Sequence, residues 1–189
     1  MNHRALGLLL VPLLAFVAPS EAAAKPVAVD VEGALGPGAS ASTWRGDAAV
    51  QTSLFLGLRF GDLISIDALT RLGYATVDDR MLTYLSFGVT MFGRVWKLRP
   101  YARLALVHQH EEPRSAISDD PGGAVFGVGN GIRHRGGFGG SLGLQIPIAQ
   151  VRSTELFTGG DVTSTYFPDS RGPAFYWGAG LWLGANFRL

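Results

Sequence analysis

The sequence predicts an all-β protein, an eight-stranded antiparallel up-and-down transmembrane β-barrel that follows a cleavable signal peptide. Apolar and polar side chains alternate in repeated runs of about ten residues, as in strands with one apolar face. No run after the N-terminal region reaches the ~20 consecutive apolar residues of a transmembrane helix. Only Lys25 and Lys97 are lysines, although a soluble β-sandwich normally places lysine on its faces and edges. Strands with a lipid-facing side explain all three observations.

The N-terminus has the three parts of a secretory signal peptide. His3 and Arg4 give a charged start, residues 5–18 an apolar middle, and residues 22–24 a small-residue cleavage site. The apolar stretch is too short for a membrane-spanning helix and is broken by Pro12. We therefore expect residues 1–24 to be removed and residues 25–189 to form one barrel domain.

Charge and cysteine content exclude several classes of protein. The formal net charge is +1, and it stays there without the signal peptide, because that segment carries one base, Arg4, and one acid, Glu21. A nearly neutral chain without a basic block argues against a nucleic-acid partner. The chain contains no cysteine, which excludes a disulfide scaffold and a thiolate metal site.

Alternation of side chains places the eight strands. We expect them within residues 27–35, 50–60, 64–74, 81–91, 101–109, 138–146, 152–166 and 175–189. Short turns are expected at residues 61–62, 93–98 and 147–151. Loops are expected at residues 36–47, rich in Gly, Pro and Ser, and at residues 111–137, which are polar and then glycine-rich.

Residues 124–132 leave an alternative open, because Phe126, Val128 and Ile132 lie on one side of a possible strand. Nine strands would conflict with the even number found in bacterial single-chain barrels. We therefore interpret residues 124–132 as part of the long loop. In the alternative they form the sixth strand, and residues 152–166 belong to the last loop.

Aromatic side chains on the apolar faces fall at the two ends of the predicted strands. Phe60 and Phe187 lie at the end with the short turns, and four others lie at the end with the loops, namely Tyr74, Phe138, Tyr166 and Phe175. Such girdles mark the two membrane interfaces of a barrel. The apolar faces should therefore point outward to lipid.

The opposite faces carry charges that we expect inside the barrel. They comprise five acids and four arginines, namely Asp30, Glu32, Asp67, Glu155, Asp161, Arg59, Arg71, Arg103 and Arg188. Because buried charges need partners and guanidinium matches carboxylate, we predict a lumen charge network. Bulky inward residues beside glycines should fill the remaining space, namely Phe55, Tyr84, Phe157, Tyr176 and Trp182.

These features resemble the small eight-stranded outer-membrane barrels of the OmpA and OmpX type. The resemblance covers residues 27–189 and rests on the signal peptide, the strand pattern, the Arg99-Pro100-Tyr101 opening of the fifth strand and the alternating hydrophobes of the last strand. It implies a monomer without cofactors in the outer membrane of a Gram-negative bacterium. Its implied partners are membrane lipid, lipopolysaccharide and the barrel-assembly machinery. Members typically end on Phe, which that machinery recognises; here Phe187 and Leu189 share a face and are expected to carry the assembly signal.

The segment His108-Gln109-His110-Glu111-Glu112 is a dense group of potential ligands. His108 and His110 share a strand face, which suits zinc or copper if Glu111, Glu112 or His134 joins them. The same residues fit the solvent-exposed base of a loop, so we predict no metal site here.

The predicted function is structural or surface-interacting, without catalysis and with a side-chain-filled lumen. Two alternatives remain open, passage of a small solute and modification of lipid A. The enzyme would need an activated serine near a base, and Ser115 and Ser118 have no fixed base in the sequence pattern. A soluble sandwich is a further alternative, in which Leu181 and Leu183 would be buried.

Overall fold

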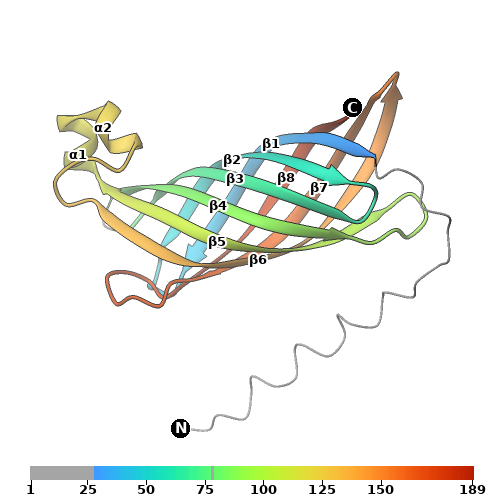
Figure 1. The fold of residues 1–189 in the computed structure, drawn as a ribbon. Helices are drawn as coiled ribbons and strands as arrows, with labels where there is room; N and C mark the ends of the chain where they lie inside the picture. The colour runs from blue at the N-terminus through green and yellow to red at the C-terminus, as the bar shows by residue number, and fades with distance from the viewer. Residues whose placement is uncertain (1–27, 78) are drawn as a thin grey trace, which may run out of the picture.

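A computed structural model describes residues 28–77 and 79–189, which form a closed antiparallel barrel (Figure 1). The predicted signal peptide and Val27 lie outside the described residues. In chain order the elements are β1 Val29–Ser42, β2 Ala48–Phe60, β3 Ile64–Ala75, β4 Arg80–Phe92, β5 Arg99–Pro113, α1 Arg114–Asp119, α2 Pro121–Val125, β6 Arg133–Val151, β7 Thr154–Tyr166 and β8 Phe175–Arg188. The predicted all-β, eight-stranded up-and-down barrel is therefore confirmed.

Each strand pairs with its neighbours in sequence, and β1 closes the ring against β8. The β1–β8 register runs from Asp30 opposite Arg188 to Ser42 opposite Tyr176. Closure gives every strand two partners, so that the sheet has no open edge. This is what a β-sheet needs in hydrocarbon, where water does not satisfy free backbone groups.

The two ends of the barrel differ. The end where β2–β3, β4–β5 and β6–β7 are joined, here called the turn end, also holds the start of β1 and the end of β8. The opposite end, here called the loop end, carries the connections after β1, β3, β5 and β7, including α1 and α2 (Figure 1). The helices are six and five residues long. Within the described ranges, no helix has the length and apolar character needed to cross a bilayer.

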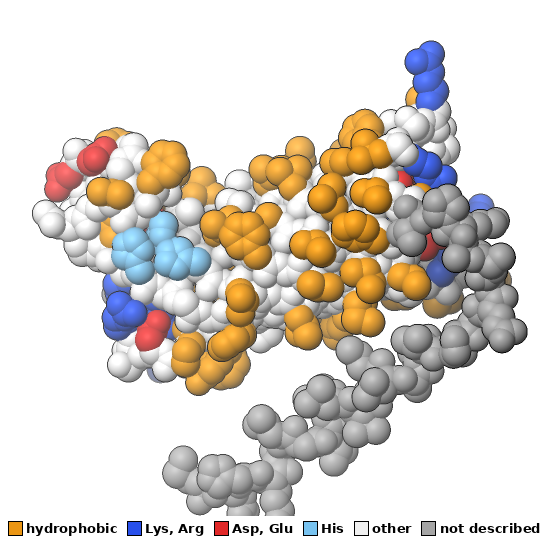
Figure 2. All heavy atoms as spheres, viewed as in Figure 1, with side chains coloured by type: hydrophobic (Ala, Val, Ile, Leu, Met, Phe, Trp, Pro, Cys, Tyr) orange, Lys and Arg blue, Asp and Glu red, His pale blue; other side chains and the backbone are white. Residues whose placement is uncertain are grey.

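Apolar side chains cover the outside of the barrel, as Figure 2 shows for one face. All six predicted girdle residues are exposed. Phe138, Tyr166 and Phe175 form one row at the loop end, paired directly across β6, β7 and β8. The soluble-sandwich alternative is wrong, because Leu181 and Leu183 are exposed on the outer surface.

The interior holds charged, polar and aromatic side chains packed closely together. Tyr84, Phe157, Tyr176 and Trp182 are buried there, and Phe55 packs against them. The room for Phe157 depends on Gly184, where an added Cβ would lie 2.3 Å from the end of the phenyl ring. A narrow barrel is thus filled by alternating large and small residues.

Both long loops are shorter than predicted. Residues 36–42 belong to β1 and residues 133–137 to β6, while β5 continues to Pro113. The prediction followed local composition, but these residues pair with strands distant in sequence, such as Ala39 with Val50 and Ala179. Only residues 43–47 and 114–132 of the two predicted loops lie outside strands.

The turn predicted at residues 147–151 is also wrong. β6 continues to Val151 through a register shift between Pro147 and Ala149, which accommodates the proline in the strand. Residues 124–132 form the end of α2 and turns, so the alternative with a strand there is wrong. Residues 154–166 form β7, as the favoured interpretation required.

The lipid-facing assignment predicts a depth-dependent cost of charge. Leu104, which is 72% exposed, lies on the outer face of β5 between Ala102, in the row of Phe60, and Leu106, in the row of Phe138. We expect Leu104→Arg to destabilise the barrel by about 2–4 kcal/mol in urea titrations in lipid vesicles. Val50→Arg is the matched control, since Val50 pairs with girdle residue Tyr74 and should cost only about 0–1 kcal/mol. Equal costs at both positions would contradict the orientation.

Candidate functional site

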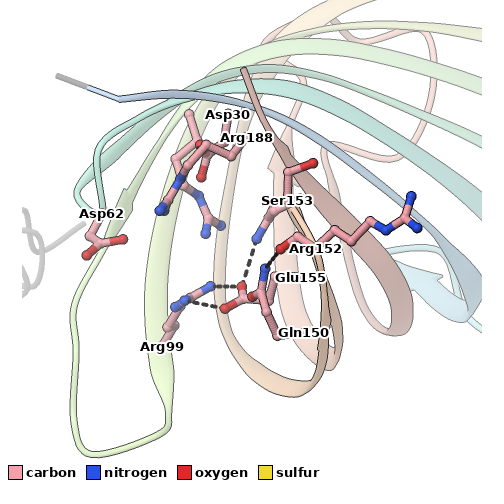
Figure 3. A pocket seen from close by; sticks show the side chains of 10 residues that line it. Asp30, Asp62, Arg99, Gln150, Arg152, Ser153, Glu155 and Arg188 are labelled. Carbon is pink, nitrogen blue, oxygen red and sulfur yellow. Dashed lines mark hydrogen bonds and ion pairs between the residues drawn. The ribbon is translucent and has the colours of Figure 1, made fainter. Parts of the chain in front are cut away.

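The lumen begins at the turn end with two ion pairs around a cavity of about 170 Å³ (Figure 3). Arg99 forms a two-point contact with the Glu155 carboxylate, with 2.8 Å between Nη2 and Oε2. Arg188 lies 3.5 Å from Asp30, but the arginine side chain is 67% exposed. Because exposed pairs are screened by solvent, the Arg99–Glu155 pair is the stronger link at this mouth.

Deeper in the lumen, Arg59 bridges β1, β2 and β6. Its guanidinium lies 2.9 Å from Glu32 and donates to the side-chain amide oxygen (Oε1) of Gln145 at 2.8 Å. The Gln145 amide in turn donates to Glu32 at 2.5 Å, and the Phe92 ring lies 3.9 Å from the guanidinium carbon. This closed triangle gives each charge a partner in a solvent-free site.

The middle of the lumen holds two further pairs. Arg103 Nε lies 2.6 Å from Asp67, which also accepts a hydrogen bond from Thr90 at 2.6 Å. Arg71 lies 3.6 Å from Asp161. These contacts join β5 to β3 and β3 to β7, so they cross the interior.

The structure thus brings each of the nine predicted lumen residues against an oppositely charged partner. The partner of Glu155 is Arg99, which sequence reasoning did not include. Arg99 shares the face of Arg103, four residues away on the same strand, and this alternation is the signal that identifies it.

A second charged cluster, centred on Glu111, closes the loop end and was not predicted. Glu111 is fully buried and contacts three arginines, Arg133 and Arg135 at 2.9 Å and Arg80 at 3.4 Å. The Tyr176 hydroxyl donates to the same carboxylate at 2.9 Å. Sequence reasoning placed Glu111 and these arginines in loops, whereas the extended β5–β6 hairpin places Glu111 opposite Arg133.

Two further acids complete this Glu111 cluster. Asp47 lies 2.7 Å from Arg80, and Asp169 lies 3.0 Å from Arg135. Phe167, also fully buried, lies under Arg135 with 4.4 Å between its ring centre and the guanidinium carbon. The connections after β1 and β7 are therefore tied into the mouth of the barrel.

Little space remains between these layers. Two internal cavities have volumes of only about 20 and 30 Å³. Each is comparable to the volume of a single water molecule. Two wider spaces, of about 170 and 210 Å³, lie at the turn end, where the lumen opens around Arg99 and Glu155.

His108, His110 and His134 meet on the outside of the barrel near the loop end. The Nε2 atoms of His108 and His110 are 2.8 Å apart, and ring centres of His110 and His134 are 4.6 Å apart. Beside them the side chain of Glu112 is fully buried. The two glutamates that were candidate ligands lie in different places. Glu112 lies beside the histidines, and Glu111 lies inside the barrel with the arginines.

Ser118 makes local hydrogen bonds in α1. Its hydroxyl donates to the backbone oxygens of Arg114 and Ser115, both within the helix. This is the local bonding of a serine in a helix.

The closed eight-stranded ring, apolar exterior and filled polar interior give the chain the fold of a small outer-membrane β-barrel. Neisserial surface protein A (NspA) is similar, with 15% identity, a TM-score of 0.54 and coverage of 85% of this chain and 97% of that chain. The N-terminal β-barrel domain of OprF from Pseudomonas aeruginosa is similar at 19% identity, with a TM-score of 0.51 and coverage of 85% and 97%.

No protein-family model and no curated protein sequence matches the chain. At these identities the similarity is one of fold. It confirms the predicted resemblance to small eight-stranded outer-membrane barrels at that level.

The buried lumen pairs predict that removing an arginine inside the barrel destabilises the protein far more than removing an arginine from an exposed pair. We expect Arg103→Met to destabilise the barrel by about 3–5 kcal/mol, because it leaves the buried Asp67 carboxylate without its guanidinium. The control is Arg94→Met, which breaks a 3.8 Å pair with Asp62 whose side chains are 73% and 63% exposed, and should cost less than about 1 kcal/mol.

Unfolding in urea, followed by gel migration of the folded and unfolded forms, measures both costs. Asp67→Asn combined with Arg103→Met should recover part of the loss, since no unpaired charge then remains. Equal effects of Arg103→Met and Arg94→Met would contradict the buried pairing.

Proposed function

We propose that the protein is a non-conducting outer-membrane barrel of structural or surface-interaction type, without catalytic activity. The observation that carries this proposal is the filled lumen, in which internal cavities measure only about 20 and 30 Å³. The fold supports a location in the outer membrane of a Gram-negative bacterium, with residues 1–24 as the signal peptide.

Passage of a solute fits the interior poorly. A permeant molecule would have to displace the Arg59–Glu32–Gln145 triangle and then the Glu111 cluster at the loop end. Breaking a buried ion pair costs several kcal/mol, so each layer is a substantial barrier.

In this proposal the loop end of the barrel faces the outside of the cell. The α1–α2 segment exposes three apolar side chains beyond the strands, namely Val125, Phe126 and Val128. Asp119 and Asp120 lie in the same segment and are exposed. These residues, together with residues 43–46, form the surface that we assign to contacts with lipopolysaccharide or other envelope components.

The end of β8 supports a role in assembly. Phe187 and Leu189 share the exposed apolar face at the turn end, and the Leu189 amide donates to the Val29 carbonyl at 3.2 Å. We assign these two side chains to recognition by the barrel-assembly machinery. The protein then acts as a monomer that needs no cofactor.

Planar-bilayer recordings test the closed lumen. We expect no steady conductance from the native barrel, because the internal cavities measure only about 20 and 30 Å³. Asp67→Ala combined with Arg103→Ala removes a mid-lumen pair and should also give no conductance, because the Arg59–Glu32–Gln145 triangle and the Glu111 cluster still close the lumen. Asp62→Ala combined with Arg94→Ala, which removes an exposed pair, is the control and should stay silent. Steady conductance of the native barrel would refute the proposal.

The absence of catalysis on lipid A is tested by expression. Lipid A from cells that produce the barrel should have the same mass as lipid A from cells with an empty vector. Outer-membrane fractionation and heat-modifiable migration establish that the folded protein is present in the same cells. A mass shift that His110→Gln abolishes would favour the enzyme alternative, and a soluble periplasmic product would contradict the membrane location.

A further inference from the structure

Three histidines from two strands form a compact patch on the outer surface, shown in pale blue in Figure 2. His108 and His110 lie on β5, and His134 lies on β6 directly opposite His110 in the register. One ring nitrogen from each lies within 4.8 Å of the others. The sequence has four histidines, and the fourth is His3 in the predicted signal peptide.

The patch lies at the edge of the apolar belt. His108 comes two residues after Leu106 on the outer face of β5, and Leu106 pairs with girdle residue Phe138. His108 and His134 are exposed, while His110 is half-buried. Girdle residues mark the hydrocarbon boundary, so these three imidazoles lie where lipid headgroups and water begin.

The protein holds His110 in a defined orientation. Gly127, in the connection between α2 and β6, packs so closely that an added Cβ would lie 2.4 Å from Cε1 of the imidazole. His110 Nε2 points to His108, whereas its other ring nitrogen, Nδ1, lies 3.7 Å from the Glu112 carboxylate. The ring therefore presents one nitrogen to the patch and the other to an acid behind it.

The environment of Glu112 indicates a bound ion independently of the histidine geometry. Its side chain is fully buried, and its Oε1 lies 3.7 Å from His110 Nδ1, with the Thr83 side chain as a second polar neighbour. His110 Nδ1 is itself buried and has no closer hydrogen-bond acceptor. A buried carboxylate behind the Nδ1 of a histidine is the usual outer-shell arrangement of metal sites, because it fixes the tautomer that presents Nε2 to the ion.

We propose that His108, His110 and His134 bind one divalent ion of the zinc and copper class, with Glu112 as a positioning residue behind His110. Imidazole nitrogen is a preferred ligand of these ions and a poor one for magnesium or calcium. Three protein ligands leave the fourth tetrahedral position open. That position is available to water or a lipid headgroup oxygen. One ring nitrogen from each histidine already lies within 4.8 Å of the others, close enough to approach a common ion.

Titration calorimetry with Zn²⁺ on the folded, untagged barrel in detergent tests the site. We expect saturation at one ion per chain. His134→Gln changes an exposed side chain and should abolish the isotherm, and His108→Gln should do the same. Asp119→Asn removes an exposed charge in the α1–α2 segment and should leave affinity unchanged.

Glu112→Gln distinguishes a positioning role from a structural one. We expect affinity to fall by about 10-fold or more while the barrel keeps its heat-modifiable migration. Co²⁺ gives a second readout, since a four-coordinate site produces a visible absorption band that His134→Gln should remove. Weak binding without saturation, or binding that His134→Gln leaves unchanged, would overturn the proposal.

Discussion

The closed ring of backbone hydrogen bonds is the constraint on which the rest of the structure depends. Hydrocarbon offers no partner to a free N–H or C=O group, so the sheet must join β1 to β8. Closing only eight strands leaves a narrow interior that side chains fill. The same closure turns the apolar faces outward, because the polar faces then have only the lumen to occupy. The reversed distribution of polarity therefore follows from backbone chemistry.

Each charged side chain inside that narrow interior then needs an oppositely charged partner within contact distance. The internal cavities measure only about 20 and 30 Å³, so a lone guanidinium or carboxylate buried between the layers would carry a large desolvation cost. The pairs Arg103–Asp67 and Arg71–Asp161 neutralise these charges, and each pair joins two strands that are not neighbours. Such cross-links also fix the shape of the barrel's cross-section. Filling, neutralising and bracing are thus three results of one set of contacts.

Alternation revealed most of the fold, because a strand with one lipid face repeats every two residues and needs no tertiary information. The same rule gave the inward charges and identifies Arg99 by its spacing from Arg103. The prediction was wrong where local composition was given more weight than strand pairing. Residues 36–42 and 147–151 contain Gly or Pro and were assigned to a loop and a turn, but they continue strands that are paired with their neighbours. The Glu111 cluster was missed for a related reason, since its members come from separate connections that only closure brings together.

The histidine patch shows what local sequence leaves undetermined. The spacing of His108 and His110 places both on one face, but only the β5–β6 register puts His134 opposite His110. A connection of nineteen residues between these strands, residues 114–132, gives no register by itself. One residue of slip would turn His134 into the lumen, because side chains alternate between faces. The pairing of Glu111 with Arg133 disfavours that slip. The buried cluster inside the mouth thus sets the geometry of the imidazoles outside it.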